Sequence, residues 1–346
     1  MLSDFDPLKS VYIYQFPYWK WPVVRQCFPG FRILFVDRVI AIKPGSFLVL
    51  WGMTSVPKGL PENVSVLRIE DGFIRSVGLG ADLIKPLSWV IDAQGIYYDA
   101  TRSSDLESIC LNTQFDSLLL KRAKTLRRKI VASNVTKYNV GSRKWQRPNN
   151  LPRVILVPGQ VETDASLFYG APKVRHNMEL LRKVRATNSN AYILYKPHPD
   201  VLARLRVEGK DEGSAMQWCD EVVTDVCMGD LLNKVDEVHV LTSLAGFEAL
   251  LRKIPVTCYG QPFYSGWGLT HDNILNARRT RRLSLDELVA AALIKYPIYL
   301  SRESRSLVSP EQALDEMLVW QSQANFQTPW WREVLRFFLR LIGGIK

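Results

Sequence analysis

One segment of the sequence, residues 196–200, joins a lysine, a histidine and an aspartate to two prolines in the order Lys-Pro-His-Pro-Asp. The flanking prolines hold the backbone of His198 extended, which fixes where its imidazole points, and Lys196 adds a cation beside it. Together these two side chains could bind a phosphate group. A lone histidine is more often structural, but a proline-rich loop after an apolar run favours a function.

A second candidate anion site lies at residues 242–248, where Ser243 is expected to cap the N-terminus of a helix. The free N–H groups and the positive dipole end of such a helix attract phosphate. Glu248 lies about one turn further in, where its carboxylate could accept both hydroxyls of a ribose. The alternative is that Ser243 only caps the helix and Glu248 is a solvated helix residue.

Residues 158–166 also follow a short apolar run, and Gly159 permits close approach of the backbone to a ligand. Gln160 and Asp164 could then project into a cleft. The alternative is an ordinary turn in which Asp164 or Ser166 caps a helix.

Two further segments carry groups that suit a sugar or a phosphate ester. The loop at 259–268 is rich in glycine and aromatic residues, among them Tyr264 and Trp267, and its rings suit a base or a sugar. A loop packed under a domain interface would look similar. In the first half, Glu70 and Asp71 suggest general acid/base or nucleophilic work, and the alternative for them is a salt bridge to a neighbouring arginine, Arg75 or Arg68.

The apolar runs predict the scaffold that must bring these segments together. In the first half, buried parallel strands are expected at 11–14, 33–36, 47–52, 64–69 and 88–92. A helix is expected over 114–132, with one face formed by Phe115, Leu118, Leu119, Ala123, Leu126 and Ile130. The second half is expected to form strands at 153–159, 191–197, 237–242 and 255–260, and helices near 175–187, 214–220 and 244–252. The two series predict an α/β protein with two Rossmann-like domains facing a cleft.

Length and composition agree with two domains. The chain has 346 residues, whereas single cores stop growing near ~250–300, and the polar, basic stretch at 133–152 marks the expected boundary. With 47% hydrophobic and 23% charged residues, a mostly disordered protein is excluded. The net charge of +11 favours nucleic acid, an anionic membrane surface or a phosphorylated substrate. Because the basic residues are dispersed and no nucleic-acid motif is present, we expect no nucleic-acid partner.

The cysteine pattern and the length of the apolar stretches indicate the cellular compartment. Five scattered cysteines without paired or ligand-like spacing predict a reduced cytoplasmic protein without a zinc site. No stretch approaches the ~20 apolar residues that span a bilayer, and the start of the sequence lacks a secretion signal. We therefore expect neither a secreted nor an integral membrane protein.

Taken together, five motifs resemble those of the KpsC-type capsule polysaccharide biosynthesis proteins, which are β-Kdo glycosyltransferases. The matching stretches are EDGFIRSVGLGADL (70–83), GQVETDAS (159–166), KPHPD (196–200), TSLAGFEAL (242–250) and YGQPFYSGWGLT (259–270). The glutamine, aspartate and histidine motifs are also similar to those of bacterial sialyltransferases that use CMP-sialic acid. The resemblance implies a GT-B fold, a CMP-Kdo donor and transfer with retention of the β configuration.

By this resemblance, His198, Ser243 and Glu248 would bind the CMP phosphate and ribose, and Asp164 would be the main catalytic carboxylate and the candidate nucleophile. Glu70 or Asp71 would be the acid/base partner or would orient the acceptor. The remaining predicted substrate-binding residues are Gln160, Lys196, Gly246, Tyr264 and Trp267. KpsC usually holds two such modules in tandem, whereas this chain carries one copy of each motif, which leaves the linkage open.

The implied domains are an acceptor domain at 1–140, a CMP-sugar-binding domain at 141–300, and helices at 301–346 that return to the first domain. No cofactor is expected: no DxD motif or acidic cluster lies beside the donor segments, and His198, Lys196 and the helix end could neutralise the phosphate without a metal.

The C-terminal segment 329–346 predicts an amphipathic helix at a membrane surface. Arg332, Arg336 and Arg340 recur every four residues, and large apolar side chains cover the rest. The alternative is a terminal helix packed on the first domain. With this helix, we expect a cytoplasmic protein peripheral to the inner face of the cytoplasmic membrane, acting on a lipid-linked glycan acceptor. Two rival functions are a transferase for another CMP- or UDP-sugar and a non-catalytic scaffolding module.

Overall fold

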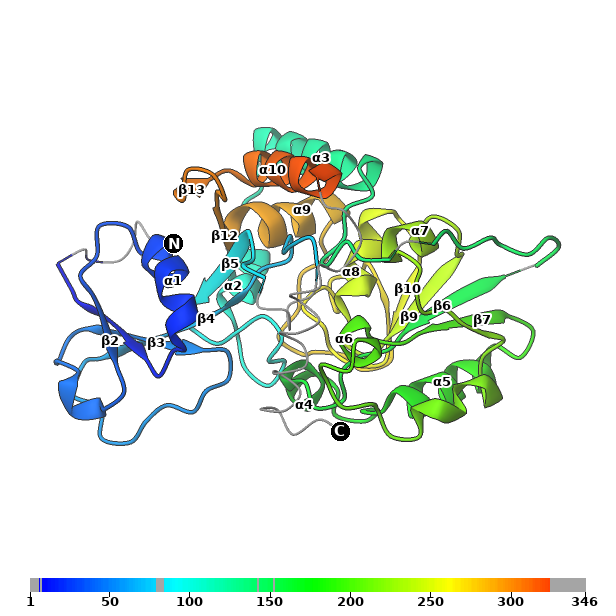
Figure 1. The fold of residues 1–346 in the computed structure, drawn as a ribbon, viewed down its shortest axis with the longest axis horizontal. Coiled ribbons are helices and arrows are strands. Elements are labelled where there is room, and N and C mark those ends of the chain that lie inside the picture. Colours follow the sequence, from blue (N-terminus) through cyan, green and yellow to red (C-terminus); the bar gives the residue numbers. More distant parts are fainter. Residues whose placement is uncertain (1–5, 7, 79–83, 142, 152, 324–346) are drawn as a thin grey trace.

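The computed structural model describes residues 6, 8–78, 84–141, 143–151 and 153–323, and these form two β-sheets with helices packed around them (Figure 1). The predicted C-terminal membrane helix at 329–346 lies outside the described residues. None of the described helices is long and apolar enough to cross a membrane.

The first sheet has seven strands in the order β13-β12-β5-β4-β3-β1-β2. Their bounds are β1 (Val11–Tyr14), β2 (Ile33–Val36), β3 (Phe47–Trp51), β4 (Ser65–Asp71), β5 (Ser88–Asp92), β12 (Pro297–Leu300) and β13 (Leu307–Val308). Strands β1 to β4 run parallel, as predicted. The prediction was wrong for β5, which pairs antiparallel with β4. A parallel connection needs a crossover, usually a helix, and the described part of 72–87 forms none.

The second sheet has six parallel strands in the order β11-β10-β9-β6-β7-β8. Their bounds are β6 (Val154–Pro158), β7 (Tyr192–Lys196), β8 (Glu221–Val222), β9 (Glu237–Val240), β10 (Val256–Cys258) and β11 (His271–Asp272). The four predicted strands of this half are confirmed. Because Pro158 pairs with Lys196, the loops that follow β6 and β7 start at the same level of the sheet.

Helices cover both sheets. They are α1 (Trp21–Cys27), α2 (Asp105–Asn112), α3 (Ser117–Ala132), α4 (Ala165–Gly170), α5 (Asn177–Thr187), α6 (Pro199–Leu202), α7 (Met228–Leu232), α8 (Leu244–Leu251), α9 (Leu285–Val289) and α10 (Pro310–Gln323). Shorter pieces are the 3-10 helices η2 (Tyr18–Lys20), η3 (Val39–Ala41) and η5 (Glu212–Gln217), and a π-helical segment η6 (Ala290–Lys295). The helix predicted near 214–220 is therefore the 3-10 helix η5.

The long helix α3 begins at Ser117 because the Asp116 carboxylate accepts a hydrogen bond from the Leu119 amide at 2.8 Å. Of its predicted apolar face, Ala123, Leu126 and Ile130 are buried. Leu118 is 76% exposed, so its assignment to that face was wrong.

The chain crosses between the sheets twice. It leaves the first sheet after β5, forms the whole second sheet, and returns as β12, which pairs with β5. One buried apolar cluster extends through both halves. At its centre, the Phe73 ring lies 4.5 Å from that of Phe263 and 6.0 Å from that of Phe247. The two sheets therefore share part of their core. The predicted domain limits stay a prediction.

A buried ion-pair group also joins the halves. Glu107 of α2 accepts from Arg278 at 2.6 Å and from Arg279 at 3.3 Å, and the Glu107 and Arg279 side chains are 5% and 3% exposed. Arg279 also donates to the backbone carbonyls of Pro262 and Ser265. This group ties the aromatic loop of the second half to the first.

Candidate active site

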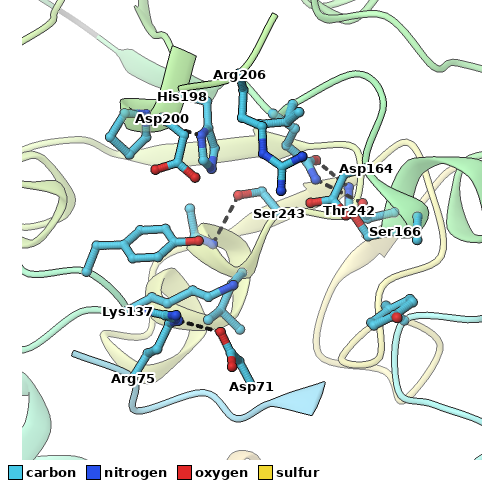
Figure 2. A pocket seen from close by; sticks show the side chains of 18 of the residues that line it. Asp71, Arg75, Lys137, Asp164, Ser166, His198, Asp200, Arg206, Thr242 and Ser243 are labelled. Atoms are coloured by element: carbon cyan, nitrogen blue, oxygen red, sulfur yellow. Dashed lines mark hydrogen bonds and ion pairs between the residues drawn. The ribbon is translucent and has the colours of Figure 1, made fainter. Parts of the chain in front are cut away.

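A cavity of about 930 Å³ lies where the carboxyl ends of strands from both sheets meet. From the first sheet it is lined by residues at the ends of β3 and β4, and from the second by residues that end or follow β6, β7 and β9. Figure 2 shows Asp164, His198, Arg206 and Ser243 on one side, and Asp71 on the other. Eight of the predicted site residues line it: Glu70, Asp71, Gln160, Asp164, Lys196, His198, Ser243 and Glu248.

Ser243 is the N-cap of α8, as predicted. Its side-chain oxygen accepts a hydrogen bond from the Ala245 amide at 3.3 Å. The Gly246 amide donates to the Ser243 carbonyl at 3.1 Å, and the positive end of the helix dipole favours an anion in the cavity.

Gln160 lines the cavity, but its amide is used to join two strand ends. Its Nε2 donates to Thr242 Oγ1 at 3.0 Å, and its Oε1 accepts from the Thr242 amide at 2.9 Å. The Gln160 backbone amide in turn donates to Asn177 Oδ1 at 2.9 Å. Gln160 thus fixes the turn after β6 against the turn after β9.

The protonation of His198 follows from its place at the start of α6. Its Nδ1 accepts a hydrogen bond from the Asp200 amide at 3.2 Å, so in the neutral ring the proton lies on Nε2. Burial, together with the charges of Lys137, Arg206 and Lys196, lowers the pKa of His198 to about 3. At neutral pH His198 can therefore act toward a ligand as a neutral Nε2–H donor.

Lys196 ends β7 and supplies a cation beside His198. Its ammonium donates to the Thr224 carbonyl at 3.4 Å, and burial lowers its pKa. A partly desolvated cation at this edge of the sheet is suited to a phosphate group.

Asp164 is exposed to the cavity at the N-terminus of α4. Although it occupies the N-cap position, its side chain makes no capping hydrogen bond, so the predicted alternative of a helix cap is not realised by Asp164. Arg206 projects into the space between His198 and Asp164 (Figure 2). A carboxylate that is not engaged in capping remains available to a substrate atom.

Glu70 and Asp71 face the cavity from the end of β4 and differ in their partners. Arg75 pairs with Asp71 at 2.5 Å, which is the predicted salt-bridge alternative for that residue. Glu70 accepts from the Tyr98 hydroxyl at 3.3 Å and from the Asp71 amide at 3.1 Å. Burial and then the Asp71 carboxylate raise the pKa of Glu70 to about 7. A carboxyl group with this pKa can exchange a proton near neutral pH, as a general acid/base must.

Glu248 is buried beside the cavity, so the alternative of a solvated helix residue was wrong. It is 7% exposed and its Oε1 accepts a hydrogen bond from the Lys137 amide at 2.7 Å. Burial raises its pKa to about 7. A carboxylate kept in this position at a cost to stability supports a role toward a ligand.

We expect the Glu248→Gln variant to flatten the pH dependence of the unfolding free energy. The pKa of Glu248 rises from 4.5 to about 7 on folding, so the folded state retains a proton that the unfolded state releases in this range. The contribution of Glu248 to the free energy of unfolding is fully present below pH 4.5. It is lost as the pH rises through about 7. Urea unfolding at about pH 5 and about pH 8 measures the change. Exposed Glu208→Gln is the control, and a wild-type pH dependence in Glu248→Gln would contradict the assignment.

Three predicted substrate-binding residues do not line the cavity. Tyr264 and Trp267 are 0% and 1% exposed, and they donate hydrogen bonds to the carbonyls of Ser243 and Phe263. Gly246 lets α8 approach the first of these rings, because a Cβ there would lie 2.2 Å from Tyr264 Oη. These residues lie in the core and support the site from behind. The loop at 259–268 is therefore better described as a packed loop, the predicted alternative, than as a ligand-binding loop.

Sequence reasoning missed several polar residues that line the cavity, among them Lys20, Tyr98, Lys137 and Arg206. Lys137 lies in the stretch 133–152, for which the sequence predicts only a domain boundary. The adjacent Lys137-Tyr138 pair was the available signal there. Arg206 and Lys20 lie outside every motif and had no local signal.

Among the described residues, no group of three or more His, Cys, Asp or Glu side chains is placed to hold a metal ion.

The comparisons with known proteins agree with this geometry. The family model of capsule polysaccharide biosynthesis proteins matches residues 58–118 and 116–300. The capsule polysaccharide modification protein LipA of Neisseria meningitidis serogroup B is 41% identical over 319 residues, which are 89% of this chain and 45% of LipA. The lipopolysaccharide-processing protein LpsZ of Rhizobium meliloti is 39% identical over 315 residues, which are 86% of this chain and 71% of LpsZ. The chain thus spans about half the length of LipA.

Two solved structures of Thermosulfurimonas dismutans KpsC share the fold. Its beta Kdo 2,7 transferase is 40% identical with a TM-score of 0.74, over 90% of this chain and 99% of the solved chain. Its beta Kdo 2,4 transferase is 28% identical with a TM-score of 0.78, over 91% and 99%.

Two α/β halves that face a shared cavity with the carboxyl ends of their strands define a GT-B protein, as the sequence predicted. The chain belongs to the family of capsule polysaccharide biosynthesis proteins.

Proposed function

We propose that the protein is a retaining glycosyltransferase that moves Kdo from CMP-Kdo to a glycan acceptor in capsule or surface polysaccharide biosynthesis. The observation that carries this proposal is that Asp164, whose side chain makes no capping hydrogen bond, lines one cavity with the anion-binding groups of the second sheet and with Glu70 of the first. The 40% identity to a named β-Kdo transferase supports the choice of sugar.

In the first step, a carboxylate oxygen of Asp164 attacks the anomeric carbon of Kdo, and the bond from that carbon to the CMP phosphate oxygen breaks. His198 donates Nε2–H to the leaving phosphate, while Lys196, Arg206 and the N-terminus of α8 stabilise its charge. These groups need no metal to neutralise the phosphate, and we propose that no cofactor is required. The carboxylate of Glu248 accepts the ribose hydroxyls.

In the second step, Glu70 takes the proton of an acceptor hydroxyl, whose oxygen attacks the anomeric carbon and releases Asp164 as a carboxylate. Two inversions at the same carbon give overall retention. The pKa of about 7 suits Glu70 to accept that proton near neutral pH.

The experiment that tests this function is incubation of the full chain with CMP-Kdo, other CMP-sugars and UDP-sugars, each with a synthetic Kdo-containing acceptor. NMR of the product reads the sugar, the anomeric configuration and the linkage. We expect a β-Kdo product from CMP-Kdo alone. Because identity is 40% to the 2,7 transferase and 28% to the 2,4 transferase, we propose a 2,7 linkage. An inverted product, or turnover of a UDP-sugar only, would contradict the proposal.

His198→Ala should weaken CMP binding and lower the transfer rate together, because a phosphate ligand stabilises both the donor and the leaving group. Loss of a hydrogen bond to a charged group predicts about 10- to 100-fold weaker CMP binding, measured by calorimetry. His198→Asn is the matched variant: its side-chain oxygen can still cap α6 but reaches less far into the cavity, so it should share the defect. Unchanged CMP affinity in both variants would remove His198 from the donor site.

We also propose that the protein works in the cytoplasm at the inner face of the cytoplasmic membrane, on a lipid-linked acceptor. This proposal is supported by the sequence at 329–346, in which arginines recur every four residues among large apolar residues. Sedimentation with anionic vesicles, with and without these residues, tests it: the truncated protein should stay in solution and keep its activity on a short soluble acceptor.

A further inference from the structure

The first domain contributes to the cavity a wall of side chains that the mechanism above does not use. The 3-10 helix η2 carries Trp19 and Lys20, and Trp51 ends β3. All three residues line the same cavity as Glu70 and Asp71. This wall is on the side of the first sheet, away from the groups proposed to hold the nucleotide.

The ammonium of Lys20 is held beside two indole rings. Its Nζ lies 2.7 Å from the ring centroid of Trp51 and 5.2 Å from that of Trp19. Trp51 is itself fixed by edge contacts with Phe16 and Trp89, each with ring centroids 6.0 Å apart. Cation–π attraction therefore sets the position of the charge from a rigid support.

The N–H donors of this ammonium remain available. Aromatic faces attract the charge of an ammonium but do not replace oxygen acceptors. Among the described residues, Lys20 Nζ has no hydrogen bond or ion pair with an oxygen atom. Burial lowers the pKa of Lys20 to about 8, against the opposing effect of Asp71 and Glu70, so at neutral pH the group is still mainly charged.

Trp19 supplies an exposed ring next to this cation. Trp19 is 37% exposed. Tyr18, one residue earlier, is 77% exposed but lies outside the cavity lining. An exposed indole offers a flat apolar surface to the face of a sugar ring. A ring surface with an adjacent cation whose donors are free matches a sugar that carries an acid group.

The nearby acids do not prevent an anion from binding here. The charge of Asp71 is balanced by Arg75 at 2.5 Å. The raised pKa of Glu70, about 7, keeps a substantial part of that residue neutral near pH 7. Lys20 can therefore attract a further carboxylate.

We propose that Trp19 and Lys20 form the subsite for the terminal sugar of the acceptor and that they recognise a carboxylate on that sugar. The inference rests on the proposed function, because it assumes that the second substrate is a glycan. The sugar ring stacks on Trp19, its carboxylate accepts from Lys20 Nζ, and one of its hydroxyls faces Glu70. A phosphate in the lipid part of an acceptor carries the same charge, but it has no ring to use the surface of Trp19.

The test compares two probes that differ in one charge, the methyl β-glycoside of Kdo and its carboxamide. Their binding to the CMP-bound full chain is measured by calorimetry. We expect the wild type to bind the carboxylate about 10- to 100-fold more tightly than the carboxamide. Lys20→Ala should lose this preference, and Lys20→Met should lose it too while keeping the apolar stem. Trp19→Ala should weaken both probes alike, by about five- to tenfold.

Two variants serve as controls. Lys43→Ala removes an exposed lysine of the same domain, and Tyr18→Ala removes the exposed ring beside Trp19; neither residue lines the cavity. Both should bind the probes as the wild type does. CMP affinity should be unchanged in all variants, because the nucleotide lies against the other sheet.

A preference for the carboxylate that survives in both Lys20 variants would overturn the inference, as would equal binding of the two probes by the wild type. Stronger competition by glycerol phosphate than by the sugar would assign Lys20 to a lipid phosphate instead. Failure of the proposed function is a separate result: no transfer from CMP-Kdo to any acceptor would refute the reaction, whereas the titration still decides whether the subsite exists.

Discussion

Replacing Asp164 with asparagine should abolish Kdo transfer while leaving CMP affinity within about threefold of the wild type. The carboxylate is proposed to form a bond with the sugar carbon, and an amide cannot do so. The nucleotide is proposed to bind to His198, Lys196 and the N-terminus of α8, which the substitution does not change. Loss of a nucleophile predicts a fall in kcat of about 10⁴-fold, measured as release of CMP and formation of product.

A matched control is Asp211→Asn. Asp211 is exposed, lies outside the cavity lining and has a positive φ of 57°, which asparagine tolerates. The activity of this variant should equal that of the wild type.

Glu70→Gln should slow the second step, so that mass spectrometry finds a Kdo adduct on the peptide that contains Asp164. An adduct on another residue, or substantial turnover by Asp164→Asn, would move the nucleophile elsewhere.

Replacing Glu107 with alanine should destabilise the protein by about 3–5 kcal/mol, the largest stability effect we expect. The substitution leaves the guanidinium of Arg279 buried at 3% exposure without its carboxylate partner. It also removes the partner of Arg278 at 2.6 Å. Chemical unfolding of the full chain measures the loss.

Lys129→Ala provides the comparison, because it breaks an ion pair with Asp315 whose side chains are 37% and 59% exposed. Exposed pairs contribute less than about 1 kcal/mol, since water screens the charges. The structural account of the Glu107 group would fail if the two variants lost similar amounts of stability.

Strands and loops at strand ends could be predicted from the sequence where a short local pattern determines them. Apolar runs between breakers identified four of the six strands of the second sheet, all except the two-residue strands β8 and β11. The prolines around His198 and the capping serine at 243 marked loops at strand ends. Because parallel strands end at one edge, residues far apart in the chain, such as Asp164 and Ser243, could be expected to meet.

Other features depend on contacts that no local pattern reports. The direction of β5 is set by its pairing with β4 and with β12, a strand more than two hundred residues later. The rings of Tyr264 and Trp267 have the composition of a ligand loop, and only packing against α8 and Phe263 shows that they are core. Lys20 and Arg206 reach the cavity from segments without a motif, so only the three-dimensional structure shows that they line it.

The return of the chain to the first sheet has a consequence for how the molecule can be divided. Because β12 covers one edge of β5, the second sheet is an insertion in the first domain, tethered at both ends. A fragment cut after the first half would expose β5 as an unpaired edge, which is prone to pair with other chains and aggregate. An exchange of the second sheet between relatives should therefore replace the inserted segment between β5 and β12 and keep both of those strands from one parent.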